Sequence, residues 1–312
     1  MTRSPETLLR PVPRLPDVIG LTPIIELSRY ARGHARIVAK LEWLNPGGSV
    51  KDRIARAMIE DAEERGLLRP GGTIVEPTSG NTGISLAMLA AAKGYRCVIV
   101  MPEGSAQLKS RIMEAMGVEV IRTPAAEYMP GAIKKAEQIA RETPGAYLPN
   151  QFANPVNPRV HYETTGPEVF SALGDAIEAF VVGVGTTGTF TGVSRFLRER
   201  IPGLLRVAAE PQGSILGGGE RGRHEVEGIG LSFYPPILDR SMIDRVITVT
   251  DADAFAACRL LAKTEGLLVG GSSGVAAEAA LRVARELGPG KTVVTILPDG
   301  AERYPSQGIF GA

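Results

Sequence analysis

The chain has 312 residues, 44% of them hydrophobic and 22% charged, so it can bury a substantial core and its composition is unlike that of disordered proteins. Its 35 basic and 34 acidic residues are interspersed and give a formal net charge of +1, which favours a small-molecule partner over nucleic acid or an anionic membrane. Two cysteines without a CxxC pair, and three histidines without serine, cysteine or acidic partners at a recognisable spacing, argue against a disulfide framework, a metal site and a hydrolytic triad.

Strands and helices are predicted to alternate along most of the chain. Short β-branched runs predict strands at residues 37–41, 73–75, 97–101, 118–121, 180–184, 205–208, 246–249 and 293–297. A 3.6-residue hydrophobic period predicts helices at 84–93, 133–142, 190–200, 254–265 and 275–287. Gly94 and Gly266 follow two of these helices, where a left-handed residue is expected. This order indicates an α/β fold with mostly parallel sheets covered by helices, in which ligands bind beyond the strand C-termini.

Lys51 lies in the first motif that could carry chemistry, N-P-G-G-S-V-K-D-R at positions 45–53, between a strand and a helix. It shares a helix face with Ile54, Ala55 and Met58, so its amine is directed toward the apolar side. Desolvation lowers the pKa of an amine, and a neutral amine can form a Schiff base with an aldehyde. The alternative is a lysine whose stem packs while its head reaches solvent, and helix position alone favours that alternative.

The second motif, E-P-T-S-G-N-T-G at positions 76–83, follows a strand and precedes a helix. It presents hydroxyls, an amide and backbone N–H groups at the positive end of a helix dipole, which suits a carboxylate. Ordinary capping explains one of these polar residues but not the whole run. The motif alone leaves a carboxylate site and a structural loop as alternatives.

The third motif, F-V-V-G-V-G-T-T-G-T at positions 180–189, contains G-x-G-x-x-G between a strand and a helix. Glu210 ends the next strand at roughly the separation of a ribose-binding acid, so a dinucleotide site is one interpretation. The three threonines in the loop favour a phosphate monoester instead. A purely structural turn is the third alternative, and the motif alone does not separate the three.

Three further segments could contact a ligand. The G-G-S-S-G run at positions 270–274 precedes a helix, and either Ser272 or Ser273 would by default be its N-cap. A serine hydroxyl also suits a pyridine nitrogen that stays unprotonated, because the hydroxyl is a neutral donor. Gln151 and Gly228 lie in polar or flexible loops that are, taken alone, ordinary turns.

Taken together, these motifs resemble the cysteine synthase and cystathionine β-synthase family of fold-type II pyridoxal-phosphate enzymes, from G-L-T-P at 20–23 to Tyr304. The resemblance implies a tryptophan-synthase-β-like fold with two domains. Residues 45–155 would form a smaller, mobile domain that grips the substrate, and 1–44 plus 156–312 a larger domain that binds the cofactor phosphate. One departure is visible, because many members have G-T-G-G-T where this chain has G-T-T-G-T at 185–189.

The resemblance also implies a role for each motif. Lys51 would be the catalytic residue and would bind pyridoxal 5′-phosphate covalently, with no metal involved. The other cofactor-binding residues would be Asn81, Gly185, Thr186, Thr187, Gly188, Thr189 and Ser272. The substrate would be bound by Thr78, Ser79, Gly80, Asn81, Thr82, Gln151 and Gly228.

The implied activity is β-replacement, which makes L-cysteine from O-acetyl-L-serine or O-phosphoserine and sulfide. One alternative is cystathionine β-synthase-type condensation of serine with homocysteine, an activity whose enzymes the segments at 211–216, 226–230 and 268–272 resemble more closely. Another is serine or threonine deamination. More distant alternatives are a nicotinamide-dependent oxidoreductase and a non-catalytic binding protein. The resemblance implies a homodimer and a serine acetyltransferase as a potential partner. Because no continuous apolar segment addresses or anchors the chain, we expect a cytoplasmic protein.

Overall fold

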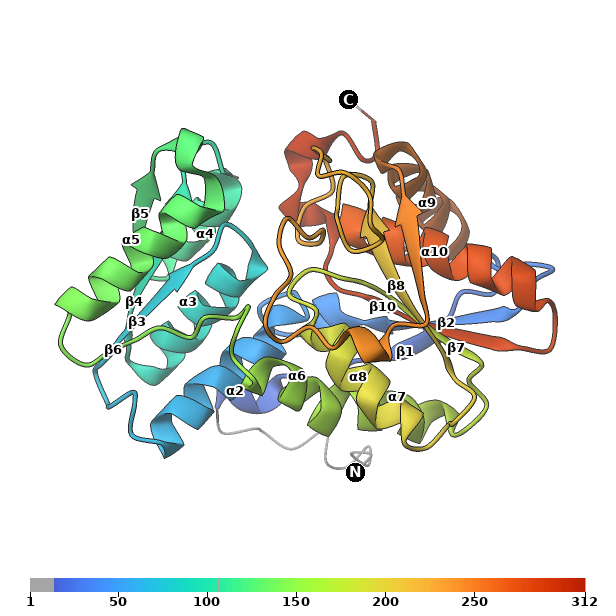
Figure 1. The fold of residues 1–312 in the computed structure, drawn as a ribbon, viewed down its shortest axis with the longest axis horizontal. Helices are drawn as coiled ribbons and strands as arrows, with labels where there is room; N and C mark the ends of the chain where they lie inside the picture. Colours follow the sequence, from blue (N-terminus) through green and yellow to red (C-terminus); the bar gives the residue numbers. More distant parts are fainter. Residues whose placement is uncertain (1–13, 106, 312) are drawn as a thin grey trace. The chain divides into compact units, whose positions relative to one another are not determined.

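The computed structural model describes residues 14–105 and 107–311, which form two compact units (Figure 1). The smaller unit contains residues 14–21, 45–47 and 51–150, and the larger unit contains residues 22–44, 48–50 and 151–311. The domain bounds expected from the sequence stay a prediction, and the structure groups residues 14–21 with the smaller unit. The segment before residue 14, in which no targeting signal is expected, and Ala312 lie outside the described residues.

The smaller unit is a four-stranded parallel sheet in the order β5-β4-β3-β6. Its strands are β3 (Thr73–Pro77), β4 (Arg96–Pro102), β5 (Glu119–Thr123) and β6 (Ala146–Tyr147). Its helices are α2 (Lys51–Glu64), α3 (Asn81–Lys93), α4 (Gln107–Ala115) and α5 (Tyr128–Glu142), with the 3₁₀ turns η1 (Leu15–Val18) and η3 (Ala125–Glu127). Alternate residues of the central strands pack against α2, α3 and α4 on one face and against α5 on the other. Both faces are therefore covered, as the apolar, non-alternating strands predict.

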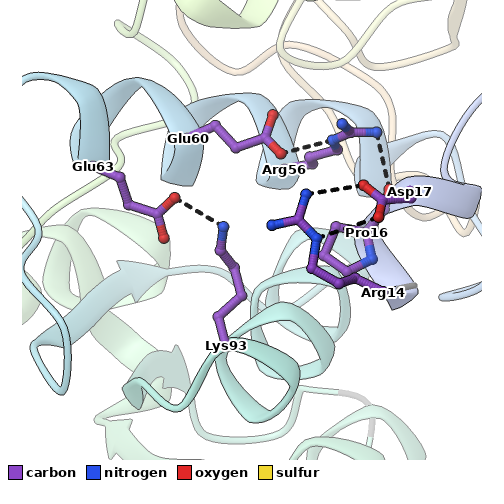
Figure 2. A network of polar contacts seen from close by, with 7 residues as sticks. All are labelled: Arg14, Pro16, Asp17, Arg56, Glu60, Glu63 and Lys93. Carbon is purple, nitrogen blue, oxygen red and sulfur yellow. Dashed lines mark hydrogen bonds and ion pairs between the residues drawn. The ribbon is translucent and has the colours of Figure 1, made fainter. Parts of the chain in front are cut away.

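The N-terminal segment is held on the smaller unit by a network of charged groups, shown in Figure 2. Arg56 on α2 donates to the Pro16 carbonyl oxygen at 2.9 Å and to the Glu60 carboxylate at 2.9 Å. Lys93 on α3 pairs with Glu63 on α2 at 2.8 Å. Partly exposed ion pairs contribute only about 0–1 kcal/mol each, so this network fixes position more than it adds stability.

The larger unit is a six-stranded sheet in the order β1-β2-β10-β7-β8-β9, parallel except for the antiparallel edge strand β1. Its strands are β1 (Ile24–Glu26), β2 (Arg36–Leu41), β7 (Ala179–Gly183), β8 (Leu205–Pro211), β9 (Arg245–Val249) and β10 (Thr292–Leu297). Its main helices are α6 (Val156–Val160), the π-helical segment η4 (His161–Thr165), α7 (Gly166–Leu173), α8 (Gly188–Arg198), α9 (Asp251–Glu265) and α10 (Gly271–Leu287). Its 3₁₀ turns are η2 (Glu42–Leu44), η5 (Arg240–Met242), η6 (Ala301–Arg303) and η7 (Pro305–Gln307). Helices α9 and α10 cover one face of the sheet, and α7 and α8 cover the other.

The structure confirms the α/β fold class, each of the predicted strands and each of the predicted helices, with end points shifted by a few residues. Gly94 and Gly266 adopt φ values of 76° and 71°, so both end their helices in the left-handed conformation as expected. The short elements β1, β6, α4, α6 and α7 were not predicted, because two- to nine-residue segments carry little periodic signal. Within the described residues, no helix is long and apolar enough to cross a membrane.

Candidate active site

Both units carry residues that the sequence singled out. The smaller unit holds Lys51 and the loop Thr78, Ser79, Gly80, Asn81 and Thr82, and the larger unit holds Gln151, Gly185, Thr186, Thr187, Gly188, Thr189, Gly228 and Ser272. In each unit, the main loops follow the C-terminal end of a parallel strand and lead into a helix N-terminus. This is where open α/β sheets bind ligands. Among residues 14–105 and 107–311, no cluster of three or more histidine, cysteine or acidic side chains could hold a metal.

The loop from β3 to α3 carries the predicted carboxylate-binding residues. Thr78 is buried, donates its N–H to the Val100 carbonyl at 2.9 Å, and accepts from the Gly80 N–H at 3.2 Å through its hydroxyl. Gly80 is the N-cap of α3 and, as a glycine, has no side chain that could cap the helix. The loop therefore leads into a helix N-terminus, a position that suits a carboxylate.

Lys51 is the first residue of α2, and its helix face is as the sequence predicts, with Ile54, Ala55 and Met58 buried and Lys51 itself half-buried. The next residue, Asp52, is fully buried. It accepts the Gly47 N–H at 2.6 Å and the hydroxyl of Ser85 on α3 at 2.5 Å.

Because Ser85 lies one turn into α3 and its hydroxyl also contacts the Asn81 carbonyl at 3.1 Å, Asp52 joins the two helix starts. The turn that bears Lys51 and the loop that bears Asn81 are thus held together in the smaller unit. This link was not expected from the sequence.

The loop from β7 to α8 has the geometry of an anion cradle. Gly185 approaches the loop at 228–229 so closely that a Cβ atom at this position would lie 2.7 Å from the Gly228 carbonyl oxygen. Gly230 donates its N–H to the Val184 carbonyl at 2.9 Å, which fixes the second loop along the end of β7. The larger unit therefore brings Gly228 beside the predicted phosphate loop.

The threonines of this loop fit a phosphate group. Thr187 is 2% exposed, and its Oγ1 atom has no hydrogen-bond partner in the described part of the chain. Thr186 Oγ1 lies 3.1 Å from Asn157 Nδ2, and Thr189 Oγ1 lies 3.1 Å from His161 Nε2. A buried hydroxyl without a partner costs free energy unless a ligand satisfies it. Hydroxyl donors at the start of an eleven-residue helix are suited to a phosphate monoester.

The contacts of Glu210 do not fit the ribose-binding acid of a dinucleotide site. The residue is the last but one of β8 and is 1% exposed, and its carboxylate accepts N–H groups from Leu216 at 3.0 Å and Gly217 at 2.9 Å. Thr248 Oγ1 donates to the same carboxylate at 3.2 Å. These contacts make Glu210 a support for the following loop, so the acid needed by the dinucleotide interpretation is already engaged.

Ser272 is the second residue of α10, and the N-cap of this helix is Gly270. The default expectation that Ser272 or Ser273 is the N-cap is therefore wrong. Ser272 is 3% exposed, and its Oγ atom lies 3.5 Å from Asp299 Oδ1. Asp299 is buried and accepts a short hydrogen bond from the hydroxyl of Tyr304. Capping therefore does not explain this buried serine, whose hydroxyl donates a long hydrogen bond to the Asp299 carboxylate.

Asn157 connects two predicted site segments. This residue is fully buried on α6, and its Nδ2 group donates to the Gln151 carbonyl at 2.8 Å as well as to Thr186. Gln151, which is itself buried, is thereby tied to the phosphate loop. Asn157 was not predicted from the sequence, because its partners lie 6 and 29 residues away along the chain and neither distance is a recognised motif spacing.

Known proteins are similar to this chain over nearly its whole length. The family model described as "Pyridoxal-phosphate dependent enzyme" matches residues 15–299. Cysteine synthases from Staphylococcus aureus and Helicobacter pylori are 48% and 46% identical over 304 and 297 residues, which are 96% and 94% of this chain and 98% and 97% of those proteins.

Two solved structures are similar over the same length. The O-acetylserine dependent cystathionine beta-synthase from Helicobacter pylori has a TM-score of 0.91 at 45% identity, covering 97% of this chain and 100% of that one. O-ureido-L-serine synthase has a TM-score of 0.94 at 40% identity, covering 96% of each chain. The chain is thus a cysteine-synthase-like enzyme that belongs to the pyridoxal-phosphate dependent enzyme family, and its cofactor is pyridoxal 5′-phosphate.

Proposed function

We propose that this enzyme makes L-cysteine from O-acetyl-L-serine and sulfide. The observation that carries the proposal is the near-full-length similarity to cysteine synthases, at 48% and 46% identity. The preference for O-acetylserine over O-phosphoserine is supported by a 45% identical structure whose name specifies O-acetylserine dependence. In the overall reaction the β-carbon loses its bond to the acetoxy oxygen, acetate leaves with the electron pair, and sulfide forms the new carbon–sulfur bond.

Lys51 carries two roles in the proposal. Its amine would hold the cofactor covalently, and once displaced by the substrate it would take the proton from the substrate α-carbon and later return it. The chemistry supplied by the bound cofactor is the withdrawal of electrons from that α-carbon. The Asp52–Ser85 hydrogen bond of 2.5 Å supports this assignment, because it holds the turn bearing Lys51 against the start of α3.

The remaining residues bind and orient. The backbone N–H groups and side chains at Thr78, Ser79, Gly80, Asn81 and Thr82 bind the substrate carboxylate at the N-terminus of α3, and Gln151 also contacts this carboxylate. The loop of Gly185, Thr186, Thr187, Gly188 and Thr189 binds the cofactor phosphate. Ser272 would donate its hydroxyl proton to the ring nitrogen in place of its long hydrogen bond to Asp299, and Gly228 would line the substrate side. The unpartnered hydroxyl of Thr187 supports the phosphate assignment most directly.

Synthesis of cystathionine from homocysteine is the second candidate. A specific observation favours it, namely the similarity to a structure named as a cystathionine beta-synthase, at 45% identity. The choice between sulfide and homocysteine as nucleophile is set by the shape of the substrate side of the site, where the loop at 226–230 contains Gly228.

A product assay separates these candidates. Purified enzyme would be given O-acetylserine, O-phosphoserine or serine, each with sulfide, with homocysteine or with neither, and cysteine, cystathionine and pyruvate would be measured. We expect cysteine from O-acetylserine and sulfide to form fastest. Cystathionine as the faster product would replace the first candidate by the second, and pyruvate formed without a nucleophile would indicate a deaminase. The Lys51→Ala variant is the control, because any product that it forms does not depend on the proposed catalytic lysine.

We further propose a cytoplasmic homodimer that can bind a serine acetyltransferase, as the family resemblance implies. Light scattering on the purified protein tests the dimer, and co-purification with a serine acetyltransferase tests the partner. A monomeric mass at micromolar concentration would exclude the homodimer.

A further inference from the structure

The phosphate loop is flanked by one helical segment that places polar side chains against two of its threonines. Asn157 on α6 and His161 at the start of η4 are four residues apart, so both face α8. Gly192 on α8 makes this close approach feasible, because a Cβ atom there would lie 2.8 Å from His161 Cβ. His161 is 1% exposed, so its ring is held in one environment.

The Asn157 contact fixes the direction of one hydrogen bond. Its Nδ2 group lies 2.8 Å from the Gln151 carbonyl oxygen, and a carbonyl oxygen can only accept. The amide orientation is therefore determined by chemistry, and the second Nδ2 proton points to Thr186 Oγ1 at 3.1 Å. Because Thr186 Oγ1 accepts this proton, its own single proton is left to donate to another group. Thr186 is thereby polarised as a donor.

The His161 ring can do the same for Thr189 only when its Nε2 atom carries a proton. Its Nδ1 atom lies 2.9 Å from Thr165 Oγ1 and its Nε2 atom lies 3.1 Å from Thr189 Oγ1. If the proton sits on Nδ1, Nε2 accepts the Thr189 proton and removes that donor from the loop. If the proton sits on Nε2, Nδ1 accepts from the Thr165 hydroxyl and the Thr189 proton is free to donate. An anion-binding loop requires the second arrangement.

We propose that His161 is a positioning residue that carries its proton on Nε2 and thereby makes Thr189 a hydrogen-bond donor to the cofactor phosphate, as Asn157 does for Thr186. This inference rests on the proposed role of the loop in phosphate binding. Thr165, fully buried behind the ring, can donate its hydroxyl proton to Nδ1, as this arrangement requires. A single helical segment thus sets the polarity of two loop hydroxyls.

Nuclear magnetic resonance on the holoenzyme tests the proton position directly. The chain contains three histidines, so ¹⁵N-histidine labelling gives few signals, and a His161→Gln sample assigns the signal of interest. We expect a protonated Nε2 in the wild-type holoenzyme. An unprotonated Nε2 would overturn the proposal, whatever the variants do.

Matched variants test the consequence for cofactor binding, measured by titrating the apoenzyme with pyridoxal phosphate. His161→Met removes the donor, and we expect the affinity to fall about tenfold, the effect of one hydrogen bond to a charged group. In His161→Gln, the glutamine side chain reaches as far as the histidine Nε2 atom and keeps an amide donor near that position. We expect the affinity of this variant for pyridoxal phosphate to stay within about threefold of wild type. Thermal unfolding of each apoenzyme reports whether the variant folds.

Double variants separate positioning from general packing. If His161 acts through Thr189, adding His161→Met to Thr189→Val should change the affinity by less than about twofold, whereas adding it to Thr186→Val should keep its full effect. A full effect in the Thr189→Val background would overturn the proposal. If Thr189→Val weakens binding but His161→Met does not, only this inference fails. If neither threonine variant weakens binding, the phosphate loop itself is misassigned and both proposals fall.

Discussion

Glu210 offers a quantitative test of whether the glycine-rich loop serves a dinucleotide. Its carboxylate is 1% exposed and accepts N–H groups from Leu216 and Gly217 at 3.0 and 2.9 Å. In Glu210→Gln, the side-chain amide turns an NH₂ group toward one of these N–H donors, so one charge-assisted bond is lost and two donors face each other. The lost bond is worth about 1.5–3 kcal/mol, and a buried N–H without an acceptor costs about 1–3 kcal/mol more. We therefore expect the free energy of unfolding to fall by about 3 kcal/mol.

Thermal unfolding measures this loss. For a unit of this size, about 3 kcal/mol corresponds to a fall in melting temperature of about 6–12 °C. The exposed Glu220 gives a matched control, since Glu220→Gln should change stability by no more than about 0.5 kcal/mol. Calorimetric titration with NAD completes the assay, and we expect no binding by either variant or the wild type. A Glu210→Gln protein with wild-type stability, or NAD binding that depends on Glu210, would refute the reasoning.

Four further predictions concern the site and the thiols. Lys51→Ala should abolish turnover and the absorbance band near ~410 nm. The melting temperature should stay close to wild type, because Lys51 is only half-buried. Residual turnover above a trace would contradict the catalytic role proposed for Lys51. Ser272→Ala should lower turnover modestly, since one neutral hydrogen bond is worth about 1 kcal/mol. Ser272→Asp should lower turnover more, because a carboxylate favours protonation of the cofactor's pyridine nitrogen. An aspartate variant as active as wild type would show that another group faces this nitrogen. Burial raises the pKa of Cys97 and Cys258 to about 12, so at pH 8 roughly 1 thiol in 10⁴ is ionised and Ellman's reagent should react only after unfolding. Thr187→Gly should weaken cofactor binding without destabilising the apoenzyme, as measured by titration and thermal unfolding.

Much of the fold was predictable because its signals are local. The strands β3, β4, β7 and β10 are buried apolar runs, and helices α3 and α9 each end at a glycine in the left-handed conformation. The face of α2 that carries Lys51 followed from residue spacing alone, since Ile54, Ala55 and Met58 are buried as expected. Local pattern fails where an element is too short to show a period, as in the two-residue strand β6.

The parts of the site that sequence could not reveal depend on contacts between distant residues. In the sequence, no serine, cysteine or acidic residue lies at a recognisable catalytic spacing from His161. The role proposed for His161 depends on the fold, which brings Thr189 to its ring from 28 residues away. Glu210 shows the opposite error. Its distance from the glycine-rich loop fits a ribose-binding acid, but the segment after β8 folds back and takes both carboxylate oxygens. Residue spacing in the sequence therefore suggests which residues could act together, but the contacts in the folded chain determine which of them do.

Thr187 links the sequence departure to the chemistry of the loop. This is the position at which many family members have glycine, and the residue adopts a φ of 73°, which is left-handed and strained for threonine by about 1–2 kcal/mol. Its hydroxyl is also buried without a partner among the described residues, which adds a desolvation cost. A glycine would avoid both costs, so threonine is a net loss to the loop unless the hydroxyl gains a partner. In the proposed site a phosphate oxygen would supply that partner, and the left-handed backbone would place a hydroxyl donor where glycine would offer only its backbone N–H.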